Sequence, residues 1–178
     1  MGFQGLWLWS ADRKNLAQFR VDGFTFNRLQ PYTSWDSVYP EAMRLWRSYV
    51  DIVKPEAATR LAVRYINRIE LPEPVGNLDQ YFTTTPRIPL DIPQVLNGFL
   101  TRVMIAHPEL KLSANVTQAL EHRIDAAGIV IILDIDAYRS GQFAPLGTDI
   151  DRVFGHLRQY KNEIFFGSLD DHLVSRYQ

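Results

Sequence analysis

Two carboxylates lie two residues apart at the end of the most apolar stretch of the chain. Asp134 and Asp136 follow the run Ile129–Leu133, and in a strand the residues at i and i+2 project from the same face. Two carboxylates on one face could hold a divalent cation or divide the roles of acid and base between them. The structural alternative is a strand that simply leaves the core at this point. The sequence leaves both interpretations open.

Arginines line one face of another predicted strand. Arg64 and Arg68 alternate with the residues of the opposite face, and Arg60, four residues before Arg64, shares their face. We expect this strand inside the sheet, where a desolvated guanidinium is costly unless it is paired. Two kinds of partner fit these arginines: a small anionic ligand, or carboxylates of the chain itself. The candidate carboxylates are Asp134, Asp136 and Glu70. Arg64, Arg68, Asp134 and Asp136 are therefore the candidate ligand-binding residues.

Other catalytic motifs do not accompany these residues. The chain has no cysteine, which excludes thiol catalysis and cysteine-ligated zinc. It also has no G-x-S-x-G elbow, no P-loop and no G-x-G-x-x-G motif. The histidines share no metal-ligand spacing; they are His107, His122, His156 and His172. From the sequence we assign no catalytic residue, no metal ligand and no cofactor.

The elements that must position these side chains follow strand and helix patterns in turn. Asp22-Gly23 predicts a two-residue hairpin turn that places Phe19 opposite Phe26. An aromatic stripe with helical spacing predicts a helix from about residue 37 to residue 53, and strict alternation predicts a strand over residues 60–71. Three strands in meander order and a C-terminal helix follow. The predicted strands cover residues 98–106, 110–120 and 128–138.

The order of these elements, βββ-α-β-βββ-α, predicts an α+β fold. We expect a largely antiparallel, curved sheet of about seven strands packed against two main helices. The strand over residues 128–138 is apolar on both faces, so we expect it in the middle of the sheet.

Composition and charge narrow the class of protein. The chain has 178 residues, which fits a single domain over residues 1–178. Its 19 Lys and Arg against 20 Asp and Glu give a net charge of −1, whereas nucleic-acid binders usually carry a basic excess. Its longest apolar run is far shorter than the roughly 20 residues of a membrane span. We therefore predict a cytoplasmic protein that binds neither nucleic acid nor membrane.

Three stretches together resemble a sporadically distributed family of uncharacterised bacterial proteins. They are residues 24–32 with Trp35, the strand R-Y-I-N-R at residues 64–68, and residues 161–168. The resemblance spans most of the chain, the R-Y-I-N-R strand is its most specific part, and it implies no activity and no catalytic residue. Residues 3–9 are short and apolar and predict the first strand, and members of the family carry a further strand and helix ahead of it. Without that stretch, whether its absence is natural or the result of trimming, a sheet edge beside Trp7 and Trp9 stays open. Open apolar edges pair with other chains, so we predict a homodimer.

Two classes of function fit the sequence best. The first is a non-catalytic ligand-binding or protein-interaction module, favoured by the arginine strand and by the lack of a nucleophile. The second is a metal-assisted enzyme in which Asp134 and Asp136 bind the ion and Arg64 or Arg68 holds an anionic substrate. Nucleic-acid binding ranks last because the net charge is close to zero.

Overall fold

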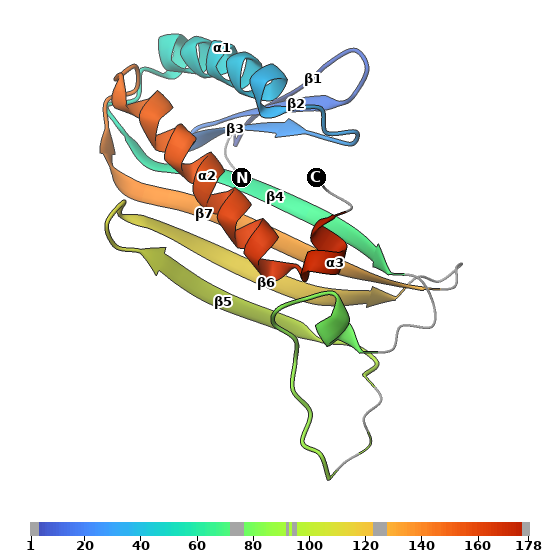
Figure 1. Ribbon diagram of the computed structural model, residues 1–178. Coiled ribbons are helices and arrows are strands. Elements are labelled where there is room, and N and C mark those ends of the chain that lie inside the picture. The colour runs from blue at the N-terminus through green and yellow to red at the C-terminus, as the bar shows by residue number, and fades with distance from the viewer. Residues whose placement is uncertain (1–3, 72–76, 92, 94–95, 123–127, 176–178) are drawn as a thin grey trace. The chain divides into compact units, whose positions relative to one another are not determined.

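The computed structural model describes residues 4–71, 77–91, 93, 96–122 and 128–175. The α+β prediction is confirmed: seven strands form antiparallel sheets that pack with two main helices (Figure 1). The strands lie in two sheets, of three and four strands. The chain accordingly divides into a three-stranded unit, Met1–Ala58 with Ala144–Gly147, and a four-stranded unit, Thr59–Phe143 with Thr148–Gln178. The single domain predicted over residues 1–178 stays a prediction.

The three-stranded unit is a meander covered by one helix. Its strands β1 (Gly5–Trp9), β2 (Asn15–Arg20) and β3 (Gly23–Arg28) pair in chain order, and α1 (Trp35–Val53) follows. The helix begins two residues earlier than predicted because the Ser34 side chain accepts a hydrogen bond from the Ser37 amide, at 3.2 Å. β1 lies at the edge of the sheet, as predicted, and Trp7 and Trp9 are 64% and 44% exposed.

The hairpin between β2 and β3 differs in register from the prediction. Phe19 lies opposite Phe24, where the turn at Asp22-Gly23 would have placed Phe26. That turn needs a positive φ at glycine, and the described glycines with positive φ are Gly5 and Gly128. The ring of Phe24 instead packs edge-on against Phe19, at 5.5 Å between centroids, and both rings contact Tyr49 of α1. Aromatic packing against the helix therefore sets the register, and the turn chemistry does not.

The four-stranded sheet has the order β4-β7-β6-β5. Its strands are β4 (Ala58–Leu71), β5 (Leu100–His107), β6 (Leu112–His122) and β7 (Ile129–Phe143). β7 is an inner strand, as its apolar sequence predicted. The position expected for the arginine strand is wrong, because β4 lies at one edge of the sheet. β5 forms the opposite edge.

The core of this unit lies between the sheet and α2 (Asp149–Ser168), which crosses one face of the sheet (Figure 1). Leu133 and Ile135 of β7 point to that face and are fully buried, together with Val153 and Leu157 of α2. Because side chains alternate along a strand, the residues between them project to the other face. We call this the polar face. Its central residues are Arg60, Arg64 and Arg68 of β4, Asn115, Thr117 and Glu121 of β6, and Asp134 and Asp136 of β7.

One end of the core is closed by the connection that precedes β5. Phe82 forms an isolated bridge with Leu169, beyond α2, and both side chains are buried. The Thr83 hydroxyl donates to the Gly167 carbonyl at 2.7 Å, and the Asp170 amide donates to the Tyr81 carbonyl at 2.9 Å. This short segment is thereby fixed against the end of α2. No helix among the described residues is long and apolar enough to cross a membrane.

Candidate functional site

Arg64 and Asp134, two of the four candidate residues, form a two-pronged ion pair on the polar face. The Arg64 Nε donates to Asp134 Oδ1 at 2.9 Å, and its terminal nitrogen donates to Oδ2 at 2.6 Å. The side chain of Asp134 is only 17% exposed, whereas that of Arg64 is 59% exposed. Hydrogen bonding to this carboxylate raises the pKa of Arg64 above its usual value. A parallel pair of this kind fixes both side chains across neighbouring strands.

Asp136 is held by a different arginine. Arg60 donates to both carboxylate oxygens of Asp136, at 2.9 and 2.8 Å, and its guanidinium stacks 4.4 Å from the centre of the Tyr138 ring. The Asn115 side-chain amide adds a longer hydrogen bond of 3.3 Å. The two aspartates therefore share a face, as their spacing predicted, but each forms an ion pair with a different arginine.

Arg68 pairs with a carboxylate that the sequence did not single out. Its Nη1 donates to Glu121 of β6 at 2.6 Å, and both side chains are about half exposed. The predicted strand ended at Leu120, one residue before this partner. Continuing its alternation by one step would have placed Glu121 on the same face as Asn115 and Thr117.

The polar face thus carries three arginine–carboxylate pairs, in each of which the two charges cancel. A divalent cation at Asp134 and Asp136 would have to displace Arg60 and Arg64 from both carboxylates. Within the described parts of the chain, no three His, Asp or Glu side chains are grouped so that they could hold a metal ion. The arrangement is suited to holding β4 against β7, and it leaves little net field to attract an anion.

We expect the pair between Arg64 and Asp134 to contribute about 1 kcal/mol to stability, the upper end for partly exposed pairs. The coupling energy of a double-mutant cycle with Arg64→Met and Asp134→Asn, read from urea unfolding, measures it. The pair between Arg20 and Asp22 is the control, because both of its side chains are more than half exposed. A coupling at Arg64–Asp134 no larger than at the control would show that the pair does not stabilise the sheet.

Lys161 of α2 is a second group that the sequence did not indicate. Its ammonium lies 3.9 Å from the centre of the Tyr65 ring of β4 and hydrogen-bonds the side chain of Asn162. Burial, with a smaller contribution from the charge of Arg158, lowers the pKa of Lys161 to about 8.

This lysine should make stability depend on pH. Between pH 8 and 10.5 the unfolded chain still binds the proton that folded Lys161 has released, so the free energy of unfolding rises with pH across that interval. Solvent contact and the Tyr65 ring, which favours the cation, reduce the rise to about 1 kcal/mol. The measurement compares urea unfolding of the wild type and Lys161→Met at both ends of the interval. Equal pH dependence in the two proteins would rule out this role for Lys161.

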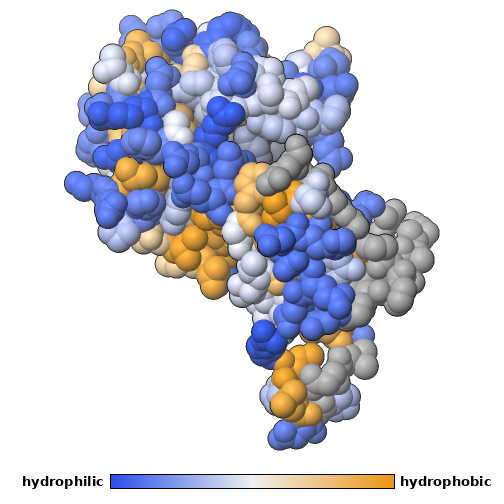
Figure 2. All heavy atoms as spheres, viewed as in Figure 1, coloured by the Kyte–Doolittle hydropathy of each residue, from blue (hydrophilic) through white to orange (hydrophobic). Residues whose placement is uncertain are grey.

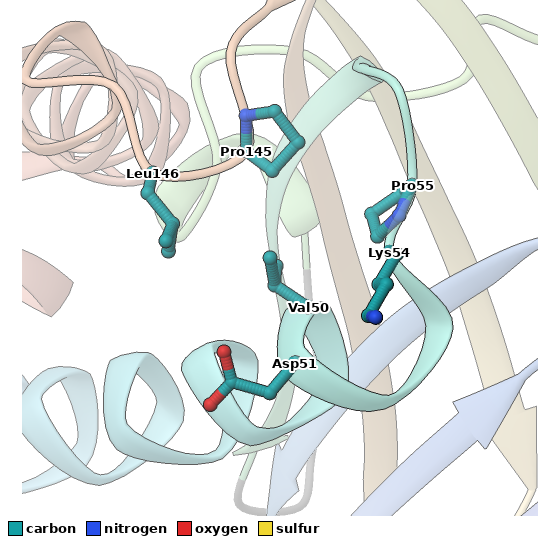
Figure 3. Close-up of a pocket in the computed structure, with 6 residues that line it drawn as sticks. All are labelled: Val50, Asp51, Lys54, Pro55, Pro145 and Leu146. Carbon is teal, nitrogen blue, oxygen red and sulfur yellow. The ribbon is translucent and has the colours of Figure 1, made fainter.

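A surface depression of about 430 Å³ belongs to the three-stranded unit. It lies between the end of α1 and the segment at residues 144–147, and its lining is mostly aliphatic (Figure 3). The side chains that line it are Val50, Asp51, Lys54, Pro55, Pro145 and Leu146. One carboxylate and one ammonium at its rim do not form a catalytic set, and none of the four candidate residues lies there.

The edge strand β5 is the most exposed apolar element of the four-stranded unit. Leu100, Val103 and Met104 are 72%, 55% and 76% exposed, and Ile105 is also exposed. Apolar side chains reach the surface along this edge of the sheet (Figure 2, compared with Figure 1). β5 pairs with β6 over all eight of its residues without a bulge, and it pairs with no strand on its other side among the described residues.

β5 also lacks the features that usually protect such an edge. Natural edge strands are short, charged, interrupted by proline or bulged. β5 carries one charged residue, Arg102, and no proline. The opposite edge, β4, carries Arg60, Arg64, Arg68 and Glu70. The two edges of one sheet are therefore built differently: β4 carries four charged residues, whereas β5 carries one and is mostly apolar.

Comparison of the chain with protein-family models, with curated proteins and with solved structures finds no match. The resemblance carried by the R-Y-I-N-R strand therefore stays a prediction. What the chain does has to be inferred from its own residues.

Proposed function

We propose that this chain is a non-catalytic protein-interaction module whose recognition element is the open edge of β5. The observation that carries the proposal is the exposure of this strand on both of its faces. An extended segment of a partner adds to such an edge through main-chain hydrogen bonds, while alternate side chains give specificity. Leu100 and Met104 on one face, and Val103 and Ile105 on the other, supply the apolar contacts.

The geometry of the polar face favours this function over the two others that the sequence left open. A metal-assisted enzyme needs carboxylates that are free to bind an ion, and Asp134 and Asp136 both accept hydrogen bonds from arginine. A small anionic ligand needs an unbalanced positive charge, and Arg60, Arg64 and Arg68 each face a carboxylate. Arg64, Arg68, Asp134 and Asp136 are therefore better explained as the residues that hold the sheet together.

Selection of peptides against the purified protein tests the proposal. The probe is a displayed library of octapeptides with alternating apolar and polar positions. We expect enriched peptides to bind the wild type, to lose binding to a Met104→Lys variant, and to shift the amide NMR signals of β5. Enriched peptides that bind both proteins equally, or a selection that enriches none while the protein is monomeric, would contradict the proposal.

Two small probes distinguish the competing functions. Titration with magnesium or with inorganic phosphate should leave the NMR signals of Asp134 and Arg64 unchanged. A saturable shift of Asp134 and Asp136 with magnesium would favour the metal-assisted enzyme. A saturable shift of Arg64 and Arg68 with phosphate would favour a binding site for a small anion.

A further inference from the structure

The main-chain groups on the free edge of β5 can be assigned residue by residue. The Leu120 amide donates to the Phe99 carbonyl at 3.1 Å, immediately before β5 begins. Phe99 and Leu120 are therefore a hydrogen-bonded pair of the antiparallel ladder, in which such pairs alternate with non-hydrogen-bonded ones. It follows that Thr101, Val103 and Ile105 direct their main-chain groups to β6. The residues that direct N–H and C=O groups to the free edge are Leu100, Arg102, Met104 and Ala106.

This pattern is compatible with a second copy of the same strand. Two antiparallel copies related by a two-fold axis at Val103 bring Leu100 opposite the second copy's Ala106, and Arg102 opposite its Met104. Each of these pairs joins residues whose main-chain groups face the free edge, so all can hydrogen-bond across the new interface. If one strand were shifted by a single residue, the main-chain groups on its free edge would lie opposite residues of the second copy whose main-chain groups already hydrogen-bond to β6.

The side chains fit the same register. On the face toward α2, Val103 lies opposite its own copy and Thr101 lies opposite Ile105. β-branched pairs of this kind are among the stabilising cross-strand pairs. The single charged residue, Arg102, lies opposite methionine, so no two like charges face each other. Both exposed faces of β5 would gain apolar neighbours.

We propose that two copies of this chain associate through antiparallel pairing of β5 with β5, centred on Val103, so that two four-stranded sheets become one continuous sheet. This inference rests on the proposed function and names its partner as a second copy. It places the dimer contact at β5, whereas the sequence had suggested the edge beside Trp7 and Trp9. An isologous contact of this kind closes on itself and does not continue into fibres.

Single cysteines test the register, because the chain has none of its own. In a non-hydrogen-bonded pair the Cα atoms lie about 4.5 Å apart, within the range of roughly 4.4–6.8 Å for a disulfide. We expect Val103→Cys to form a cross-linked dimer under mild oxidation of the full chain. Thr101→Cys is the matched control on the same face, since its two copies would lie about 13 Å apart along the strands. Equal cross-linking of the two variants, or cross-linking of Met104→Cys in place of Val103→Cys, would overturn the inferred register.

Sedimentation velocity tests the association itself. Met104→Pro removes one free-edge amide while sparing the bonds to β6, a position at which edge strands tolerate proline. Met104→Lys keeps the amide and adds a charge. We expect each variant to weaken the dimer at least about tenfold, and Trp7→Lys in β1 to leave it unchanged. Weakening by Trp7→Lys alone would place the contact at β1 and overturn the inference.

The outcomes separate this inference from the function on which it rests. If the wild type stays monomeric at high concentration while octapeptides still bind β5, the inference of a second copy as partner is overturned. The interaction module is then still supported. A monomer to which no octapeptide binds overturns both. A dimer that both Met104 variants weaken supports both.

Discussion

Replacing Phe82 by alanine is expected to lower the free energy of unfolding of the four-stranded unit by about 3–5 kcal/mol, the usual cost of removing a buried phenylalanine. The side chain is 1% exposed and lies where the connection before β5 meets the end of α2. The neighbouring backbone is hydrogen-bonded on both sides, through Thr83 and Asp170. The site therefore has little freedom to collapse into the space that the ring leaves.

Urea unfolding followed by far-ultraviolet circular dichroism measures this loss. Leu90→Ala is the matched control, because Leu90 belongs to the same connection but is 90% exposed. We expect the control to change stability by no more than about 0.5 kcal/mol. A loss below about 1 kcal/mol for Phe82→Ala would mean that this ring does not belong to the core.

Replacing Leu157 by alanine is the second substitution for which we expect a large loss in the free energy of unfolding. Leu157 is fully buried on the face of α2 that packs against the sheet, so we expect a loss of about 2–5 kcal/mol. The exposed Gln159, two residues further along α2, is the control position, and Gln159→Ala should be nearly neutral. Similar losses at the two positions would contradict the observed orientation of α2.

The same variant tests whether the two units unfold together. All four tryptophans, Trp7, Trp9, Trp35 and Trp46, lie in the three-stranded unit. Tryptophan fluorescence therefore follows that unit alone, and circular dichroism follows both. If the chain is one cooperative domain, the two transitions of Leu157→Ala coincide at a lower urea concentration. A dichroism transition that moves while the fluorescence transition stays in place would divide the chain into two domains.

Local patterns in the sequence predicted the types of element well. The apolar run at Ile129–Leu133 belongs to an inner strand, because a strand covered on both sides needs apolar residues on both faces. The aromatic stripe of α1 packs on the hairpin, with Tyr49 buried. These predictions succeeded because they depend on residues that are close together in the chain.

Predictions that depended on contacts between distant segments were less successful. Turn chemistry at Asp22-Gly23 predicted a register that the rings of Phe19, Phe24 and Tyr49 override. Alternation along β4 revealed which residues share a face, but it contains no information about which strands are neighbours. For this reason β4 was expected inside the sheet, and it lies at the edge.

The candidate site shows the same limit. Charged residues in strands need partners, and for this reason the sequence indicated four candidate residues, Arg64, Arg68, Asp134 and Asp136. It offered Glu70 as a partner and missed Glu121, which pairs with Arg68 from β6. Nor did it indicate that β5 would be exposed on both faces, because Leu100–His107 reads like any half-buried strand. Exposure of an apolar strand is a property of the assembled sheet.

The open edge of β5 carries both the proposed function and the proposed dimer, and amide hydrogen exchange measures whether that edge is occupied. We predict that the amides of Leu100, Arg102, Met104 and Ala106 are protected at high protein concentration. On dilution they should exchange rapidly, because the partner strand leaves, while those of Val103 and Ile105 stay protected by β6. Rapid exchange of the first four amides at every concentration, with no protection by added octapeptides, would contradict both proposals for β5.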